Sequence, residues 1–141
     1  MASAVKEDLR DYILADSAVA AKLGTRLFPA MARKSYGTTD PYAVYTMVSN
    51  DATYTQDGTS SSVWRVIVFQ FDIFSKSAVT AEATGDAILA RVESTKFSQG
   101  TTDFGAVFLD TEFDNFEDAT RADGSSGLFR KTIQLRTLIN S

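Results

Sequence analysis

The segment that most constrains the fold of this chain is a run of twelve residues, Val63 to Phe74, dense in β-branched and aromatic side chains. Residues of these types favour a strand. Alternation along a strand places Ile67, Phe69, Phe71 and Ile73 on one face, and Trp64, Val66, Val68, Gln70, Asp72 and Phe74 on the other. Because both faces are partly apolar, we expect one to meet the core and the other to meet a helix end or a neighbouring subunit.

Other segments predict further strands. The predicted strands are Tyr42 to Ser49, Gly105 to Phe116 and Gly127 to Ile139, with a short extended piece at Arg26 to Phe28 that Pro29 stops. The polar segment Asn50 to Ser62, with an Asp57-Gly58 turn signal, predicts a long extended hairpin. Loops are expected at Ala30 to Pro41 and Ser94 to Asp103, and a turn around Ala122 to Gly124.

Helices are predicted where apolar residues recur at helical spacing. Ser3 is expected to cap a first helix, whose apolar stripe is Val5, Leu9, Tyr12 and Ile13. Asp16 begins a short helix that Gly24 can end in a left-handed conformation. Ser77 is expected to cap the helix Ala78 to Glu93, with an inward stripe of Ala78, Ala81, Gly85, Ile88, Leu89 and Val92. Small residues in that stripe would let the helix lie close on a sheet.

The order of these elements predicts an α+β fold. We expect a largely antiparallel sheet, two main helices packed on one face and a long extended hairpin. The length of 141 residues matches one domain spanning residues 1–141. A chain of this size can bury enough apolar surface to fold without disulfides or a structural metal, and it contains no cysteine.

Composition argues against an enzyme. The chain lacks histidine and cysteine, the commonest bases, nucleophiles and transition-metal ligands, and it contains no phosphate-binding glycine motif. No catalytic residue, cofactor or metal site is therefore predicted. The formal net charge of -4 opposes tight non-specific binding of nucleic acid. No signal sequence or run of about 18 apolar residues is present, so we expect no membrane association.

A row of acidic residues is the main candidate for a metal or catalytic site. Asp110, Glu112 and Asp114 share one face of a predicted strand, roughly 7 Å apart at about 3.4 Å per residue. This spacing is too wide for strand neighbours to share Mg²⁺, although a Ca²⁺ site with loop oxygens is conceivable. Cross-strand pairing explains the row better, with Asp114 roughly opposite Arg130 and Asp110 near Gln134 and Arg136.

Two other groups of residues have a functional and an ordinary interpretation. Arg33, Lys34 and Arg65 could form a small basic patch, but solvated surface is the usual fate of such charges. The aromatic residues of Val63 to Phe74 could line a ligand pocket, but core or subunit packing is more common.

Three stretches then resemble a known family. They are "ADSAVAAKLGTRLFP" (Ala15 to Pro29), "DPYAVYTMVS" (Asp40 to Ser49) and "WRVIVFQFDIFSKS" (Trp64 to Ser77). Together with the amphipathic first helix and the alanine-rich helix, they resemble the tail terminator family of long-tailed phages, also called tail completion or tail-to-head joining proteins. Relatives occur in defective prophages and gene transfer agents. The resemblance extends to about Glu93 as a pattern of whole elements, and the later strands fit in number only.

The resemblance implies a hexameric ring in the neck region of a virion, assembled in the host cytoplasm. Such a ring caps the tail tube, stops its polymerisation and offers its other face to head-completion or connector proteins, while DNA passes through the lumen without specific binding. The interface candidates are Tyr54, Gln56, Asp57, Gly58, Arg33, Lys34, Trp64, Asp114 and Arg130. The alternatives are a head-tail adaptor (stopper), a minor tail protein or, from another class, a small-molecule-binding α+β domain.

Overall fold

The computed structural model describes residues 2–29, 41–53, 64–93, 96–100, 102–120 and 126–140. Within these ranges, the side chains of residues 2–4, 49–53, 64, 115–120, 126–128 and 140 are not described. The predicted loop from Ala30, the tip of the Asn50 to Ser62 hairpin and the turn around Ala122 to Gly124 lie outside the described residues.

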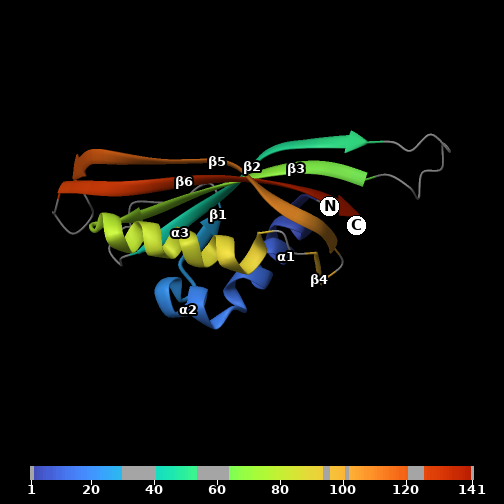
Figure 1. Ribbon diagram of the computed structural model, residues 1–141, viewed down its shortest axis with the longest axis horizontal. Coiled ribbons are helices and arrows are strands. Elements are labelled where there is room, and N and C mark those ends of the chain that lie inside the picture. The colour runs from blue at the N-terminus through green and yellow to red at the C-terminus, as the bar shows by residue number, and fades with distance from the viewer. Residues whose placement is uncertain are drawn as a thin grey trace.

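The described residues form an α+β fold, as the sequence predicts. The helices are α1 (Ala2–Leu14), α2 (Ser17–Leu23) and α3 (Ala78–Val92), and the strands are β1 (Leu27–Pro29), β2 (Tyr42–Thr53), β3 (Trp64–Ser75), β4 (Phe97–Gln99), β5 (Thr102–Thr120) and β6 (Ser126–Asn140). The strands form one curled six-stranded sheet in the order β1-β2-β3-β6-β5-β4. Every neighbouring pair is antiparallel except β1 and β2. All three helices lie on one side of this sheet (Figure 1).

Two of the predicted helix caps are confirmed. The Asp16 side chain accepts a hydrogen bond from the Val19 amide, and the Ser77 side chain accepts one from the Thr80 amide. Gly24 follows α2 at a φ of 59°, a region that favours glycine. The prediction for Ser3 is wrong, because α1 already begins at Ala2.

The inward stripe of α3 is Ala81, Thr84, Gly85, Ile88 and Val92. Ala78 is exposed, so its predicted inward position is wrong. Thr84, which the prediction left out, lies on the inward side. Its burial is possible because its hydroxyl donates to the Thr80 carbonyl at 2.8 Å, which satisfies the polar group within the helix. A Cβ added to Gly85 would lie 2.7 Å from Lys131 Cδ, so glycine allows α3 to cross β6 closely.

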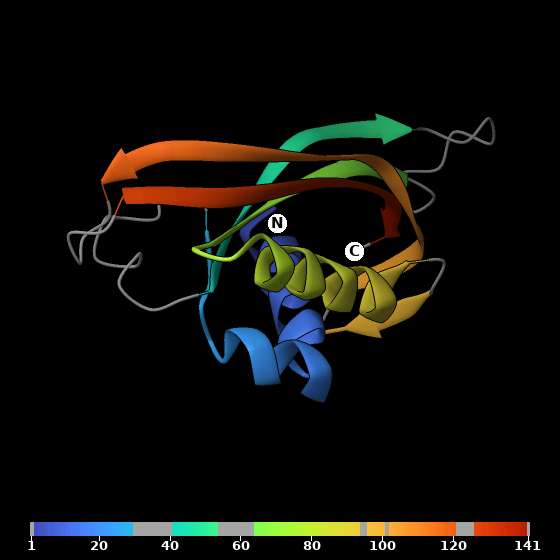
Figure 2. The same ribbon diagram turned by 60° about the vertical axis from the view of Figure 1, so that its left-hand side comes forward.

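The core lies between the helices and the sheet. Ile67, Phe69, Phe71 and Ile73 of β3 are all at most 1% exposed, which confirms the predicted inner face of this strand. The core also contains inner-face residues of β6, including Ile133 and Leu135, and the buried stripe of α1. Figure 2 shows the sheet curling around α3 and α1.

One predicted loop is wrong. Part of the expected loop Ser94 to Asp103 forms β4, which pairs with the start of β5 through Phe97 and Phe104. An aromatic stack holds this short strand against α1, since the rings of Tyr12 and Phe97 lie 3.6 Å apart and those of Phe97 and Phe104 4.5 Å apart. The guanidinium group of Arg91 in α3 lies over the Tyr12 ring, with its Cζ 3.7 Å from the ring centre.

The two long hairpins extend toward opposite ends of the sheet. The β2–β3 pair runs to Thr53 and Trp64, which confirms antiparallel pairing up to the undescribed tip. The β5–β6 pair runs to Thr120 and Ser126 at the other end (Figure 1). We call the outer part of this pair, from Thr111 to Thr120 and from Ser126 to Gln134, the β5–β6 arm.

Candidate interaction surface

The face of the sheet turned away from the helices carries apolar side chains that no described element covers. We call this face the open face. Its members on β3, β6 and β5 are Val66, Val68, Gln70, Asp72 and Phe74 of β3, Arg130, Thr132, Gln134, Arg136 and Leu138 of β6, and Phe108, Thr111 and Phe113 of β5. Phe108, Phe113 and Leu138 are 58%, 47% and 45% exposed. Exposed apolar side chains that gather in this way mark a surface for binding another molecule.

A ladder of polar side chains crosses the middle of the open face. The Gln134 side-chain amide donates to Gln70 Oε1 at 2.9 Å, and the Gln70 amide donates to Asp72 Oδ2 at 3.0 Å. The Thr132 hydroxyl donates to Asp72 Oδ1 at 2.7 Å. The ladder joins β3 to β6 and holds the Asp72 carboxylate in place. It also separates the apolar residues at the two ends of the face.

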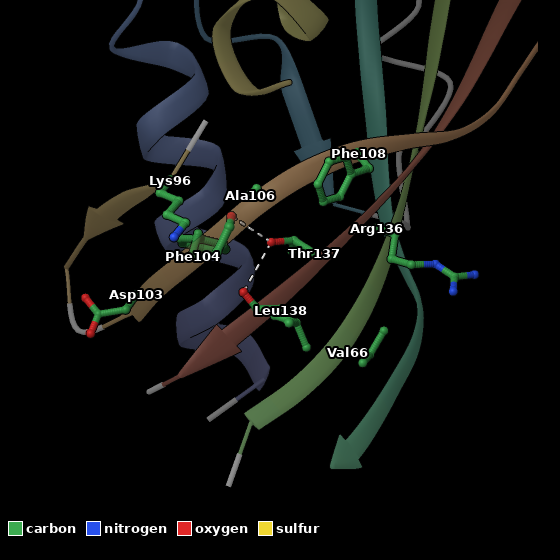
Figure 3. A pocket seen from close by; sticks show the side chains of 10 residues that line it. Val66, Lys96, Asp103, Phe104, Ala106, Phe108, Arg136, Thr137 and Leu138 are labelled. Atoms are coloured by element: carbon green, nitrogen blue, oxygen red, sulfur yellow. Dashed lines mark hydrogen bonds between the residues drawn. The ribbon is translucent and has the colours of Figure 1, made fainter. Parts of the chain in front are cut away.

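A hollow of about 810 Å³ lies at the end of the open face opposite the β5–β6 arm (Figure 3). Its walls are Val66, Phe104, Gly105, Ala106, Phe108, Thr137 and Leu138, and the charged residues Lys96, Asp103 and Arg136 lie at its edge. The pairing of β5 with β6 shifts between Phe104 and Val107, which marks a β-bulge there. The Thr137 hydroxyl lies 3.1 Å from the Gly105 carbonyl and 3.2 Å from the Leu138 carbonyl, and the hydrogen bond to Gly105 joins the bulge to β6.

The β5–β6 arm contains a buried cation. Lys131 is 2% exposed, and its Nζ forms an ion pair with Glu112 and lies 3.9 Å from Asp114 Oδ1. Burial by itself lowers the pKa of Lys131, but the hydrogen bond with Glu112 and the charges of Glu112, Asp114 and Glu82 raise it above its ordinary value. Lys131 is therefore held as a charged group between α3 and the acidic row.

The predicted pairing of Asp114 with Arg130 is wrong by one residue. Asp114 lies opposite Lys131, and Arg130 lies opposite Asn115. The pairing of β5 with β6 shifts between Glu117 and Thr120, which lie between the turn and Asp114, so residue counting across the turn does not give the register at Asp114. The other expected contact is present, since Arg136 Nη2 lies 3.6 Å from Asp110 Oδ2.

The raised pKa of Lys131 predicts a dependence of stability on pH. A base whose folded pKa exceeds its unfolded value of about 10.4 stabilises the fold below that pH, and this contribution is lost as pH rises through the folded pKa. The free energy of unfolding, measured by urea denaturation, should therefore fall from pH 10 upward. The Lys131→Met variant should show a shallower fall.

Tyr45 provides the necessary control, because burial raises the pKa of its hydroxyl as well. Its neutral form is favoured in the folded protein, so its contribution is also lost as pH rises through the folded pKa. The Tyr45→Phe variant removes the contribution of Tyr45 to the pH dependence of the unfolding free energy and leaves the contribution of Lys131. Equal slopes for the wild type and Lys131→Met would contradict the prediction.

Most of the predicted interface candidates cannot be placed. Arg33, Lys34, Tyr54, Gln56, Asp57 and Gly58 lie outside the described residues. Trp64 begins β3, but its side chain is not described. Asp114 and Arg130 both lie on the β5–β6 arm, and the side chain of Asp114 is 72% exposed. Their role in an interface stays a prediction.

Sequence reasoning missed Lys131 and the hollow. Alternation along Gly127 to Ile139 places Lys131 on the same face as Phe129 and Ile133, so the pattern contained a signal for its burial. The hollow depends on the bulge at Gly105 and Ala106 and on β6 lying between β3 and β5. No local pattern encodes that arrangement.

Within the described ranges, no group of three or more acidic side chains gathers closely enough to hold a metal ion. None of the helices described there has the length and apolar character needed to span a bilayer.

These features define a two-layer α+β protein in which helices cover one face of the sheet and no described element covers the other. No protein-family model matches the chain, and no curated protein matches it. The fold is similar to that of a chain in the solved structure described as "Virion of native gene transfer agent (GTA) particle". The TM-score is 0.64 at 15% identity, over 96% of this chain and 93% of that chain. At this identity, the likeness shows a shared fold.

Proposed function

We propose that this protein is a structural component of a phage-like particle and acts there as a tail terminator. The observation that carries the proposal is the fold likeness to a virion chain along nearly the whole length of both. In this role, the protein forms a ring, with six subunits as the expected number, that caps the tail tube and stops its polymerisation. The opposite side of the ring joins head-completion or connector proteins. The protein performs no catalysis and needs no cofactor.

The open face supports a role in assembly. Phe108, Phe113 and Leu138 expose apolar surface at both ends of one sheet face, where a monomer gains nothing from it. A ring repeats each contact by symmetry, so contacts that are weak in one subunit become strong together. The acidic balance of -4 suits a lumen through which DNA slides without being held.

A head-tail adaptor (stopper) or a minor tail protein would use the same kind of surface in the same particle. A small-molecule-binding domain is a second candidate, favoured by the apolar hollow of about 810 Å³. Light scattering after size-exclusion chromatography separates these classes, because a stable monomer that binds a small apolar ligand would favour the second candidate.

The test of the terminator role is the length of tail tubes. Tube protein that polymerises in the presence of this protein should form shorter tubes with extra density at one end, measured by electron microscopy. The physical reason is that a ring of repeated contacts binds the tube end more tightly than the next tube ring does. Heat-unfolded protein at equal concentration is the control. Tubes of unregulated length with bare ends, formed with the folded protein in excess, would overturn the assignment.

A further inference from the structure

Two long stretches of strand at the rims of the sheet pair with another described strand on one side only. β1 covers the start of β2, and no described strand pairs with Thr46 to Thr53 on the side away from β3. β4 and Glu93 cover the start of β5 as far as Val107, and no described residue pairs with Phe108 to Glu117 on the side away from β6. We call these stretches the β2 edge and the β5 edge. They extend toward opposite ends of the sheet (Figure 1).

Exposed apolar side chains lie on the same two edges. Val48 on the β2 edge is 51% exposed, and Phe108, Leu109 and Phe113 on the β5 edge are 58%, 36% and 47% exposed. Only two other large apolar side chains are exposed in the described part of the chain. The backbone N–H and C=O groups along a strand edge are a template for a further strand. Both edges therefore combine apolar surface with backbone groups that a strand would satisfy.

The directions of the strands fit the two edges to each other. Three successive antiparallel pairings join β2, β3, β6 and β5, so β5 runs opposite to β2. A second copy placed beside the first, with its helices on the same side, therefore brings its β2 edge antiparallel to the β5 edge of the first. Every neighbouring pair in this sheet except β1 and β2 has the same antiparallel pattern.

The short strands at the two rims leave room for this pairing. With Thr46 of one copy opposite Glu117 of the other, β1 lies beyond the β5 edge and β4 lies beyond the β2 edge. Val48 then lies within about two residues of the position opposite Phe113, and such diagonal neighbours are about 7 to 8 Å apart. Thr46 pairs with the open-face residue Gln70, so these neighbours lie along one face of the joined sheet.

The charges along the β5 edge favour a β2 edge over a second β5 edge. Glu112 and Asp114 lie on one face of β5, opposite Ile133 and Lys131. Two-fold pairing of two β5 edges would bring these carboxylates of both copies together, and like charges that face each other destabilise a strand pair. The β2 edge carries no charged residue from Thr46 to Asn50. It therefore lies beside the acidic strand without this repulsion.

We propose that the β2 edge of one copy of this chain pairs antiparallel with the β5 edge of a second copy and joins the two sheets into one. The pairing satisfies the backbone groups of both edges and covers the apolar side chains on them. It uses a different edge of each copy, so it is head-to-tail, and its repetition can close a ring. This inference rests on the proposed ring and names the surfaces that join its subunits.

Cross-linking between single-cysteine variants tests this contact. The native chain contains no cysteine, so Val48→Cys and Phe113→Cys each carry one thiol. The two variants are mixed at high protein concentration with a short bis-maleimide, and a dimer linked between positions 48 and 113 is expected by peptide mass spectrometry. Its yield should be roughly tenfold above that of Phe113→Cys mixed with Val79→Cys, because a bound pair has a high effective concentration. Val79 is 79% exposed on α3, which is not part of either edge.

Amide exchange separates strand pairing from a contact made by side chains alone. Hydrogen bonds of an antiparallel strand alternate between its two sides, so about every second amide of each edge lacks a strand partner in the monomer. Measured by NMR, exchange of these amides should slow at least roughly tenfold in the associated protein relative to the dilute monomer. The amides of β3 are the internal control, because this strand already has a neighbour on both sides.

Two substitutions at Val48 test the choice of partner. The Val48→Asp variant should associate several-fold more weakly than Val48→Lys, because the facing β5 edge carries Asp110, Glu112 and Asp114. Light scattering measures the association of each variant. Both substitutions place a charged side chain at the same exposed position, so the loss of apolar contact is common to them. Equal association of the two variants would overturn pairing with the acidic edge.

Other outcomes would also overturn the inference. These are a 48–113 yield equal to the control, a 113–113 link in its place, or unchanged amide exchange along both edges. A link from position 48 to added tube protein in place of position 113 would assign the β2 edge to a different partner. Tubes that are capped without a 48–113 link would overturn this contact alone, whereas the link without capping would overturn the terminator role alone.

Discussion

The Phe69→Ala variant is expected to lose about 3 to 5 kcal/mol of unfolding free energy, the range for removal of a buried phenylalanine side chain. Phe69 is 1% exposed in the middle of β3, where its neighbours across the sheet are Met47 and Leu135. The alanine leaves a cavity, and β3 cannot move to fill it because it is hydrogen-bonded to β2 on one side and to β6 on the other. Urea denaturation of the two proteins measures the difference.

Phe113→Ala is the matched control, because it removes the same side chain from the opposite face of the same sheet. Phe113 is 47% exposed, so its removal should change the unfolding free energy by no more than about 1 kcal/mol. A comparable loss of stability in both variants would mean that a structural layer covers the open face within the monomer.

The Tyr12→Ala variant has the second largest expected effect, a loss of about 2 to 3 kcal/mol of unfolding free energy. The Tyr12 ring stacks on Phe97 at 3.6 Å and carries Arg91 over its other face at 3.7 Å. Arg91 also donates from its Nε to the Tyr12 carbonyl at 3.0 Å, so α1, α3 and β4 meet at this residue. Denaturant unfolding measures the total loss, and amide exchange of β4 should rise more than that of β3.

Tyr12→Phe is the control for this prediction, since it keeps the ring and removes the hydroxyl. Its unfolding free energy should lie within about 0.5 kcal/mol of the wild type. If the phenylalanine and alanine variants were equally unstable, the stack would not be the source of the stability. A loss in the alanine variant that is uniform across β3 and β4 would show that the junction unfolds only with the whole protein.

Much of the fold could be predicted because its signals are local. The caps at Asp16 and Ser77 act on amides three residues away, and Gly24 meets a backbone requirement at its own position. The inner face of β3 follows from alternation alone, since successive side chains of a strand point to opposite sides. The order of helices and strands then gives the α+β class.

The misses arose where an element depends on residues distant in the sequence. β4 has three residues and no hydrophobic period of its own, and it is held through Tyr12 and Phe104. Ala78 matches the helical stripe in sequence but lies exposed, whereas Thr84 is buried against the sheet side of α3 and its hydroxyl is satisfied by the Thr80 carbonyl. In both cases, packing with other elements decided the outcome.

The candidate site divides in the same way. The sequence by itself determined that acidic residues share one face of β5, that β3 has a second, partly apolar face, and that histidine and cysteine chemistry is absent. Only the tertiary structure decided that β6 lies between β3 and β5, that Asp114 lies opposite Lys131 and not Arg130, and that the open face holds a hollow at one end. The physical reason is that alternation fixes which side of its own strand a residue takes, whereas strand order and register are set by the packing of the whole sheet.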